Sequence, residues 1–262
     1  MQQHAARWLI PLAVAGMIGF NGIAQWLPLN GRSTGEISDD YRVFITPAGY
    51  VFAIWSLIYA GLIAFAVYRA RTAAPHERLD AITVPFLVSC AANVGWLALW
   101  HYGFVGTSLL AMLILLGSLI VVYGRLRREP PGTRLERWCV DRPFSVYLGW
   151  VTIATLVNLS VVLEAFDARP LGLDAPGWAL VMLSAALIIA IGVARRFGDR
   201  WLLGVFIWAA IGIALAPAQA GSVTIGATLL AATTSLLAIL APRVQRRRHL
   251  STDAAASPLA RG

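Results

Sequence analysis

Lysine is absent from this sequence, and charge of either sign is scarce. All 21 basic residues are arginine, and charged residues make up 13% of the 262-residue chain, against about 25% in a typical soluble domain. Apolar residues reach 58%, where about 45–50% is usual. Without lysine the chain cannot hold retinal as a Schiff base, which excludes a rhodopsin. This composition is typical of an integral membrane protein.

Ionisable residues are also missing from the middle of every long apolar block, where proton pumps, ion-coupled carriers and voltage sensors need them. His101 and Glu164 fall at block ends. The two cysteines, Cys90 and Cys139, lie in an apolar block and in a polar connection, so we do not expect them to pair. Neither has a neighbouring Cys or His, and the sequence therefore predicts no metal site.

Eight apolar blocks follow one another, each about as long as the roughly 20 residues that a helix needs to cross a bilayer. They occupy residues 8–27, 48–68, 81–100, 106–123, 144–163, 178–194, 201–215 and 222–240. Because the blocks are apolar all round, they do not show the alternation of barrel strands. The predicted fold class is all-α, a polytopic membrane helical bundle of about eight transmembrane helices. We divide the chain into a five-helix bundle at 1–170, a three-helix extension at 171–242 and a basic tail at 243–262, expected to be disordered.

The arginines are distributed unevenly between the connections that alternate across the membrane. Only Arg32, Arg42 and Arg169 fall on one side, and the other 18 of the 21 fall on the opposite side. Because arginine-rich connections stay in the cytoplasm, we expect a multi-pass cell-membrane protein with both termini cytoplasmic. The net charge of +8 is thus mostly a topology signal. No connection is long enough for the folded basic domain that a nucleic-acid partner would need.

Neutral polar and aromatic side chains recur in four of the blocks at spacings of three and four residues, which place them on one helical face in each block. Most of them fall in the outward halves, beneath the long connection at 30–46. We therefore predict one Trp-lined pocket for a hydrophobic small molecule. The residues on these faces include Asn21, Phe52, Trp55, Tyr59, Asn93, Trp96, Tyr147, Trp150 and Asn158.

Two plainer interpretations of the same residues stay open. Asn21, Asn93 and Asn158 could only bridge neighbouring helices. The Trp residues could form belts at the membrane interface, which is the role expected for Trp100.

Three of these faces resemble motifs of the TspO/MBR family, the tryptophan-rich sensory proteins related to the mitochondrial translocator protein. Residues 46–59, TPAGYVFAIWSLIY, are similar to its second-helix motif, Pro-Pro-x-Trp-x-Phe-x-x-Val-Trp-x-x-Leu-Tyr. Asn93 and Trp96 match its third-helix Asn-x-x-Trp. Residues 147–158, YLGWVTIATLVN, are similar to its fifth-helix motif, Pro-Tyr-x-x-Trp-x-x-Phe-Ala-x-x-Leu-Asn. The resemblance covers about residues 8–166.

The resemblance implies a five-helix bundle whose pocket, closed by the first connection, binds tetrapyrroles such as haem or protoporphyrin. Tyr50 stands where the family has Trp and joins the candidate site, whereas Ala48 and Val146 replace family prolines. The family's sterol-contact pattern is missing after Asn158, so sterol binding is not expected. Family members are often homodimers. The three further helices could replace a dimer partner or form a surface for another membrane protein.

We therefore expect a non-enzymatic membrane receptor or carrier that binds a hydrophobic, tetrapyrrole-like ligand and requires no cofactor. A transporter of a neutral small solute is the first alternative, since the interior carries no charge. An enzyme acting on a membrane-dissolved substrate is the second. Against it, the apolar blocks hold no paired carboxylates and no His and carboxylate arrangement.

Overall fold

The computed structural model of the chain describes residues 2–27, 29–32, 34–41, 43–72, 76–217 and 220–240. Arg42 and the predicted basic tail at 243–262 lie outside the described residues. The described part is helical throughout and contains no strand, which confirms the predicted fold class.

The long helices are α1 (Gln2–Trp26), α3 (Ile54–Arg71), α4 (Glu77–His101), α5 (Val105–Leu126), α7 (Arg142–Ala165), α8 (Ala175–Phe197), α9 (Arg200–Ala214) and α10 (Gly221–Leu240). Within the described ranges, seven helical segments are long and apolar enough to cross a membrane, and α9 is a shorter apolar helix. The predicted seventh span was also the shortest. The shorter elements are α2 (Thr34–Asp39), α6 (Arg134–Glu136), the π-helical turn η3 (Arg137–Asp141) and the 3₁₀ turns η1 (Leu29–Gly31), η2 (Gly49–Ala53) and η4 (Pro170–Gly172).

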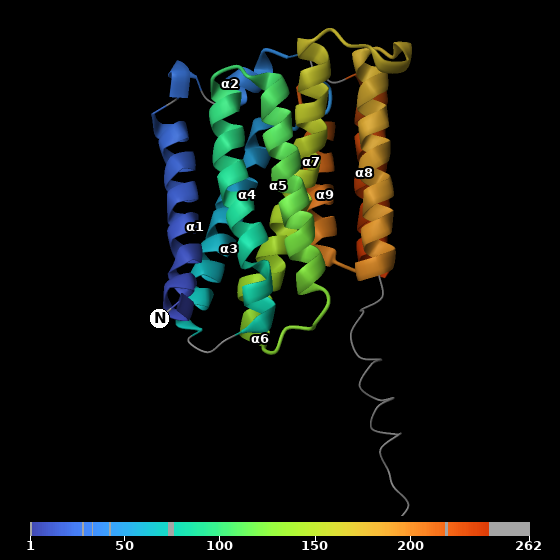
Figure 1. Ribbon diagram of the computed structural model, residues 1–262. Helices are drawn as coiled ribbons and strands as arrows, with labels where there is room; N and C mark the ends of the chain where they lie inside the picture. Colours follow the sequence, from blue (N-terminus) through green and yellow to red (C-terminus); the bar gives the residue numbers. More distant parts are fainter. Residues whose placement is uncertain are drawn as a thin grey trace, which may run out of the picture.

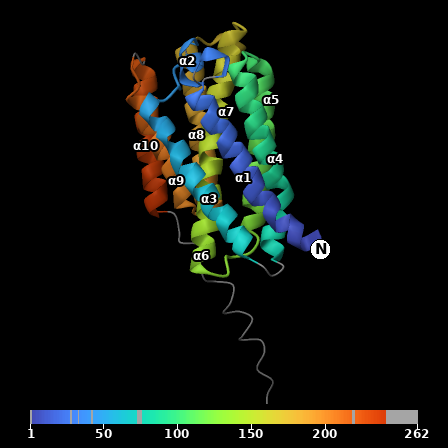
Figure 2. The same ribbon diagram turned by 90° about the vertical axis from the view of Figure 1, so that its left-hand side faces the viewer.

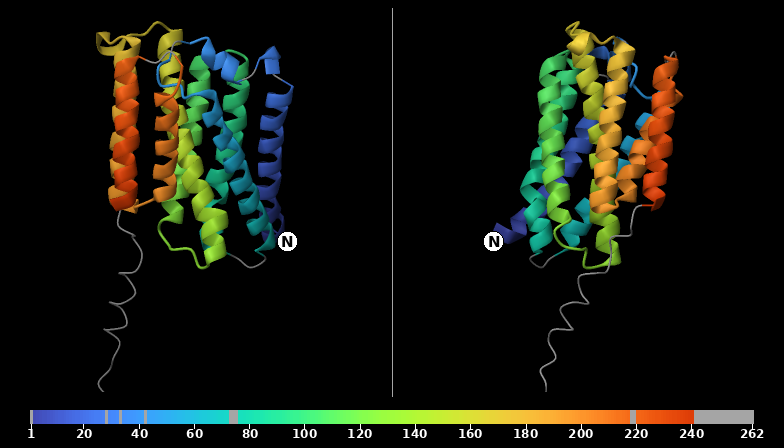
Figure 3. Two further views of the ribbon diagram at one scale, coloured as in Figure 1. Left: turned by 180° about the vertical axis from the view of Figure 1, so that it is seen from behind. Right: turned by 90° about the vertical axis from the view of Figure 1, so that its right-hand side faces the viewer.

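The long helices run side by side along one axis, with α1 and α8 at opposite flanks (Figure 1). Viewed from the α1 side, α10 lies beside α9 at the edge of the bundle (Figure 2). The start of α1 and the end of α10 lie at the same end of the bundle, together with α6 (Figure 3). We call this the Arg-rich end, since twelve of the 21 arginines lie in or beside the connections between α3 and α4, α5 and α7, and α8 and α9. The opposite end, which carries α2, is the loop end.

The outward faces of the helices are apolar, as lipid contact requires. Leu12, Leu110, Ile188 and Leu229 are each more than half exposed and lie on four different helices. Because lipid tails are as apolar as these side chains, close packing and polar contacts must hold the helices together. The polar contacts gather at the two ends of the bundle.

A buried aspartate joins the extension to the first five helices at the Arg-rich end. Asp199 caps α9 by accepting hydrogen bonds from the backbone N–H groups of Trp201 and Leu202 at 3.0 and 3.3 Å. The same side chain accepts from the hydroxyls of Tyr123 at 2.9 Å and Ser145 at 2.6 Å. It also pairs with Arg127. Asp199 therefore ties α9 to α5 and α7.

A second buried network lies at the same end, around Arg78. Its guanidinium pairs with Glu136 and Asp141, and it donates to the carbonyl of Leu126 at 3.0 Å. All three charged side chains are at most 7% exposed. Because a buried charge is tolerated only when it is paired, this network fixes the start of α4 against the turn that leads into α7.

Helix α9 packs into the bundle at both ends of its length. Near its start, Leu202 and Val205 lie against Gly149 of α7, where a side chain larger than hydrogen would not fit without a shift. Near its end, the carbonyl of Gly212 accepts a hydrogen bond from the N–H of Ala48 at 3.0 Å. The predicted extension thus contacts the segment that leads into α3.

The orientation of the bundle can be tested with reporter fusions. One reporter follows Leu240 at the Arg-rich end, and the other is inserted at Gly35 at the loop end. Because arginine-rich connections stay in the cytoplasm, the fusion after Leu240 should report the cytoplasm and the insertion at Gly35 the opposite side. Two fusions on the same side would mean that α9 does not cross the membrane.

Candidate functional site

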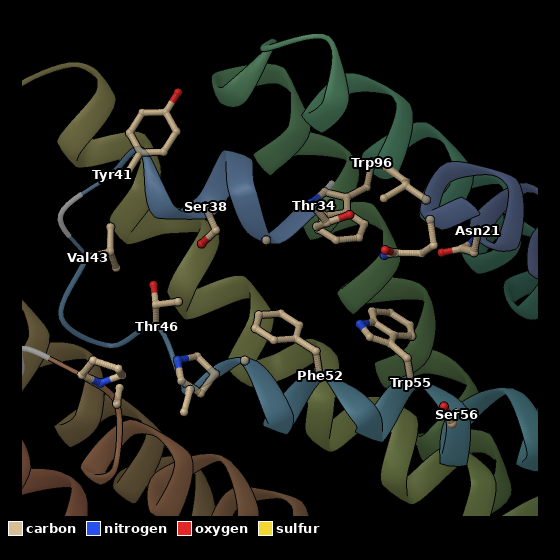
Figure 4. A pocket seen from close by; sticks show the side chains of 18 of the residues that line it. Asn21, Thr34, Ser38, Tyr41, Val43, Thr46, Phe52, Trp55, Ser56 and Trp96 are labelled. Carbon is tan, nitrogen blue, oxygen red and sulfur yellow. The ribbon is translucent and has the colours of Figure 1, made fainter. Parts of the chain in front are cut away.

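A cavity of about 840 Å³ lies at the loop end of the bundle, between α1, α3, α4 and the segment 34–49 (Figure 4). Ligand pockets in proteins measure about 300–1,000 Å³, so the cavity is large enough for a sizeable organic molecule. Its lining consists of Asn21, Gln25, Thr34, Gly35, Ser38, Tyr41, Val43, Phe44, Thr46, Pro47, Ala48, Gly49, Phe52, Trp55, Ser56, Tyr59, Trp96, Leu97, Ala216 and Pro217.

Aromatic rings form the inner walls of the cavity. Phe52, Trp55 and Tyr59 follow one another at spacings of three and four residues along η2 and α3 and share one face. The Trp55 and Tyr59 rings stack with centroids 5.6 Å apart. Trp96 of α4 lies across the cavity from Trp55 (Figure 4). A flat ligand would find ring faces on two sides.

Two further predicted residues support these rings from behind. Trp150 packs edge-on against Phe52 at 5.8 Å and against Trp55 at 6.4 Å between ring centroids. Tyr147 packs edge-on against Trp55 at 6.2 Å. Both are at most 2% exposed and neither lines the cavity. Their role in the structure is to position Trp55 and Phe52.

An amide network closes the inner end of the cavity. Asn21 donates through Nδ2 to Oδ1 of Asn93 at 2.8 Å, and Tyr59 donates through its hydroxyl to Oδ1 of Asn21 at 3.0 Å. These bonds join α1, α4 and α3. Asn93 is fully buried and bridges helices, while Asn21 both bridges helices and lines the cavity.

The segment at 34–49 covers the cavity. The end of α4 contacts this segment and fixes its position. Trp100 donates through Nε1 to the carbonyl of Thr34 at 3.2 Å. The prediction that Trp100 belongs to an interfacial belt is wrong: its side chain is 4% exposed, because the covering segment buries it. His101, also buried, lies with Nε2 3.5 Å from the Thr34 hydroxyl.

An exposed ion pair closes the covering segment on its outer side. Both carboxylate oxygens of Asp40 bind the Arg32 guanidinium, at 2.6 and 2.8 Å. This contact lowers the pKa of Asp40 below its ordinary value, since the guanidinium stabilises the charged form. The ion pair therefore contributes fully to folding stability at pH values above the ordinary pKa of an aspartate. This contribution is lost only in acid, as the pH falls through the lowered pKa of Asp40.

Besides Asn93, Tyr147 and Trp150, two further predicted site residues lie outside the cavity lining. Tyr50 is 47% exposed and packs edge-on against Trp208 of α9, with centroids 5.4 Å apart. Asn158 is buried and donates to the Ser108 hydroxyl at 3.4 Å, which joins α7 to α5. The predicted residues that do line the cavity are Asn21, Phe52, Trp55, Tyr59 and Trp96.

The sequence motifs missed the polar rim of the cavity. Thr34, Ser38, Tyr41 and Thr46 come from the covering segment, whose polar composition indicated a cap but not which side chains face inward. Two lining groups, the Thr46 hydroxyl and the Nε1 of Trp96, are buried without a hydrogen-bond partner among the described residues.

The other missed residues come from the connection after α9. Ala216 and Pro217 line the cavity although no motif marks them. Trp208 of α9 donates through Nε1 to the carbonyl of Val51 at 3.1 Å and so holds η2 in place. The extension therefore contributes to the wall of the cavity as well as to its support.

A family model described as TSPO-like protein matches residues 7–241 of the chain. The match therefore runs beyond the first five helices, where the motifs lie, and includes α8, α9 and α10. No curated protein and no solved structure matches the chain significantly.

Proposed function

Because the chain belongs to the TSPO-like protein family, we propose that it is a membrane receptor or carrier that holds a flat, hydrophobic, tetrapyrrole-like ligand in the cavity beneath α2. The observation that carries this proposal is the aromatic lining. Trp55 and Phe52 on one side and Trp96 on the other present ring faces to the same space (Figure 4).

The distribution of polar groups supports an amphiphilic ligand. Hydroxyls of Thr34, Ser38 and Thr46 lie toward the covering segment, and the aromatic rings lie deeper. A porphyrin has an apolar ring and carboxylates at one edge, so its ring would stack on the indoles while its carboxylates accept hydrogen bonds at the rim. Haem and protoporphyrin share this shape.

A carrier of a neutral solute is the second candidate. The described lining holds hydroxyl and amide groups but no Asp, Glu, Arg or His, which suits an uncharged cargo. The same lining holds no carboxylate or histidine for proton transfer, so we propose a non-catalytic role.

The proposal is tested by titrating the purified protein with protoporphyrin, haem, a retinoid, a carotenoid and a sterol, with tryptophan quenching as the readout. We expect saturable binding of the porphyrins in the micromolar range, at one molecule per chain, since two indoles line a single cavity. The sterol should not bind in that range. Absence of porphyrin binding together with saturable binding of a small neutral solute would replace the receptor by the carrier.

A further inference from the structure

At the Arg-rich end, far from the cavity, Arg142 contacts a pair of tryptophans and has two further arginines close by. Arg142, at the start of α7, lies with its Cζ 3.3 Å from the ring centroid of Trp138 and 4.8 Å from that of Trp201. The two indole rings are 5.6 Å apart and nearly perpendicular. Arg134 and Arg137 lie close enough to repel the charge of Arg142. The guanidinium is thus fixed between two rings and among like charges.

Three buried carboxylates at this end of the bundle pair with other arginines. Glu136 and Asp141 pair with Arg78, and Asp199 pairs with Arg127. Within the described ranges Arg134, Arg137 and Arg142 have no ion pair with a carboxylate. In the same described residues, Nη1 of Arg142 and Nε of Arg137 are buried and have no hydrogen-bond partner. A cation without a carboxylate partner is costly when part of it is buried, and the rest of both side chains is accessible, so the cluster is suited to an anion from outside the chain.

The surroundings of the cluster suit an amphiphilic ligand better than a small ion. Trp138 is 47% exposed and Trp201 43% exposed. Trp138 lies near the start of a segment that is long enough to span a bilayer, and Trp201 lies at the start of the shorter apolar helix α9. Exposed Trp residues at this level lie among lipid headgroups. Leu135, 61% exposed, presents an apolar side chain in the same turn. A lipid with an anionic headgroup and apolar chains would complement both the arginines and the exposed apolar side chains of this surface.

We propose that Arg142, which lies against Trp138 and Trp201, and the neighbouring Arg137 bind the phosphate of an anionic phospholipid headgroup. Both arginine side chains are partly exposed. Their accessible guanidinium N–H groups would donate to the phosphate oxygens, and the indoles would contact the upper acyl chains. The site is separate from the tetrapyrrole cavity and does not depend on its function.

The test measures lipid binding to the full-length protein in neutral detergent by native mass spectrometry, with phosphatidylglycerol and phosphatidylcholine as probes. Wild type should bind phosphatidylglycerol more tightly. Arg142→Gln and Arg137→Gln should each weaken that binding about fivefold, the effect of roughly 1 kcal/mol per arginine near an anionic surface. Arg128→Gln is the matched control. Arg128 is exposed at the same end of the bundle and has no indole partner among the described residues, so this substitution removes the same charge without disturbing the cluster. If Arg142→Gln does not fold, Arg137→Gln carries the test.

Soluble glycerol phosphate distinguishes the source of the phosphate. Displacement of phosphatidylglycerol only at high concentrations of glycerol phosphate supports a lipid site, in which the acyl chains contribute to binding. Glycerol phosphate binding as tightly as the lipid would overturn the lipid assignment. Equal loss in Arg128→Gln and Arg142→Gln would also overturn the proposal, since it would show only a general attraction of positive charge.

Discussion

Replacing Trp55 by Leu should weaken tetrapyrrole binding by about one order of magnitude. The side chain lines the cavity with its ring face, and each aromatic pair is worth about 0.5–1.5 kcal/mol beyond buried area, where 1.4 kcal/mol is a factor of ten. Leu keeps much of the apolar volume and removes the indole. Affinity is measured from the absorbance of the bound porphyrin, because quenching changes when a Trp is removed.

The neighbouring variants sharpen this prediction. Trp96→Leu should have a similar effect from the opposite wall, and Trp150→Leu a smaller one, because Trp150 lies behind Trp55 and does not line the cavity. Trp201→Leu is the control, because Trp201 lies at the start of α9 and does not line the cavity. Wild-type affinity in both Trp55→Leu and Trp96→Leu would show that these rings are structural.

The second large effect is expected at Gly212, where α9 meets η2. A Cβ at this position would lie 2.1 Å from Cγ2 of Val51 and 3.3 Å from Cβ of Pro47. Gly212→Ala must therefore push η2 away, and Phe52 is in η2. We expect at least a tenfold loss of tetrapyrrole affinity and a destabilisation of about 1–3 kcal/mol, the usual cost of overpacking.

Gly204→Ala is the matched control for this substitution. It lies on the same helix, and a Cβ there would meet nothing within 4 Å. Thermal unfolding and porphyrin titration of the two variants separate a general effect of alanine in α9 from displacement of η2. If Gly212→Ala binds the porphyrin like Gly204→Ala, the extension does not position the cavity.

The helices could be predicted from the sequence because lipid imposes a simple rule on composition. Each apolar block became a helix, including the short block that became α9. The faces with Phe52, Trp55 and Tyr59 also follow from helical spacing, since side chains three and four residues apart lie together. These residues reach the cavity as predicted.

The predictions that failed concern residues whose positions depend on contacts between distant segments of the chain. Trp100 was assigned to a belt because its position near a block end fits one, but the covering segment buries it. Tyr50 was assigned to the site by motif alone, and its ring packs on Trp208, 158 residues further along the chain. The residues that face inward from 34–49 could not be chosen, because an irregular segment has no period. Ala216 and Pro217 could not be predicted either, because they reach the cavity through the packing of α9.

The central claim is that the ligand occupies the cavity beneath α2, and filling that space tests it most directly. Gly35 lines the cavity, and a Cβ at this position would meet nothing within 4 Å. Gly35→Trp therefore adds bulk to the cavity while leaving every indole in place. Gly19→Trp, on the exposed face of α1 with equally open surroundings, is the control. In a protoporphyrin titration followed by absorbance, Gly19→Trp should bind like wild type and Gly35→Trp should lose binding by two orders of magnitude or more. Binding of protoporphyrin to Gly35→Trp with wild-type affinity would contradict the claim, because the ligand would then lie elsewhere on the protein.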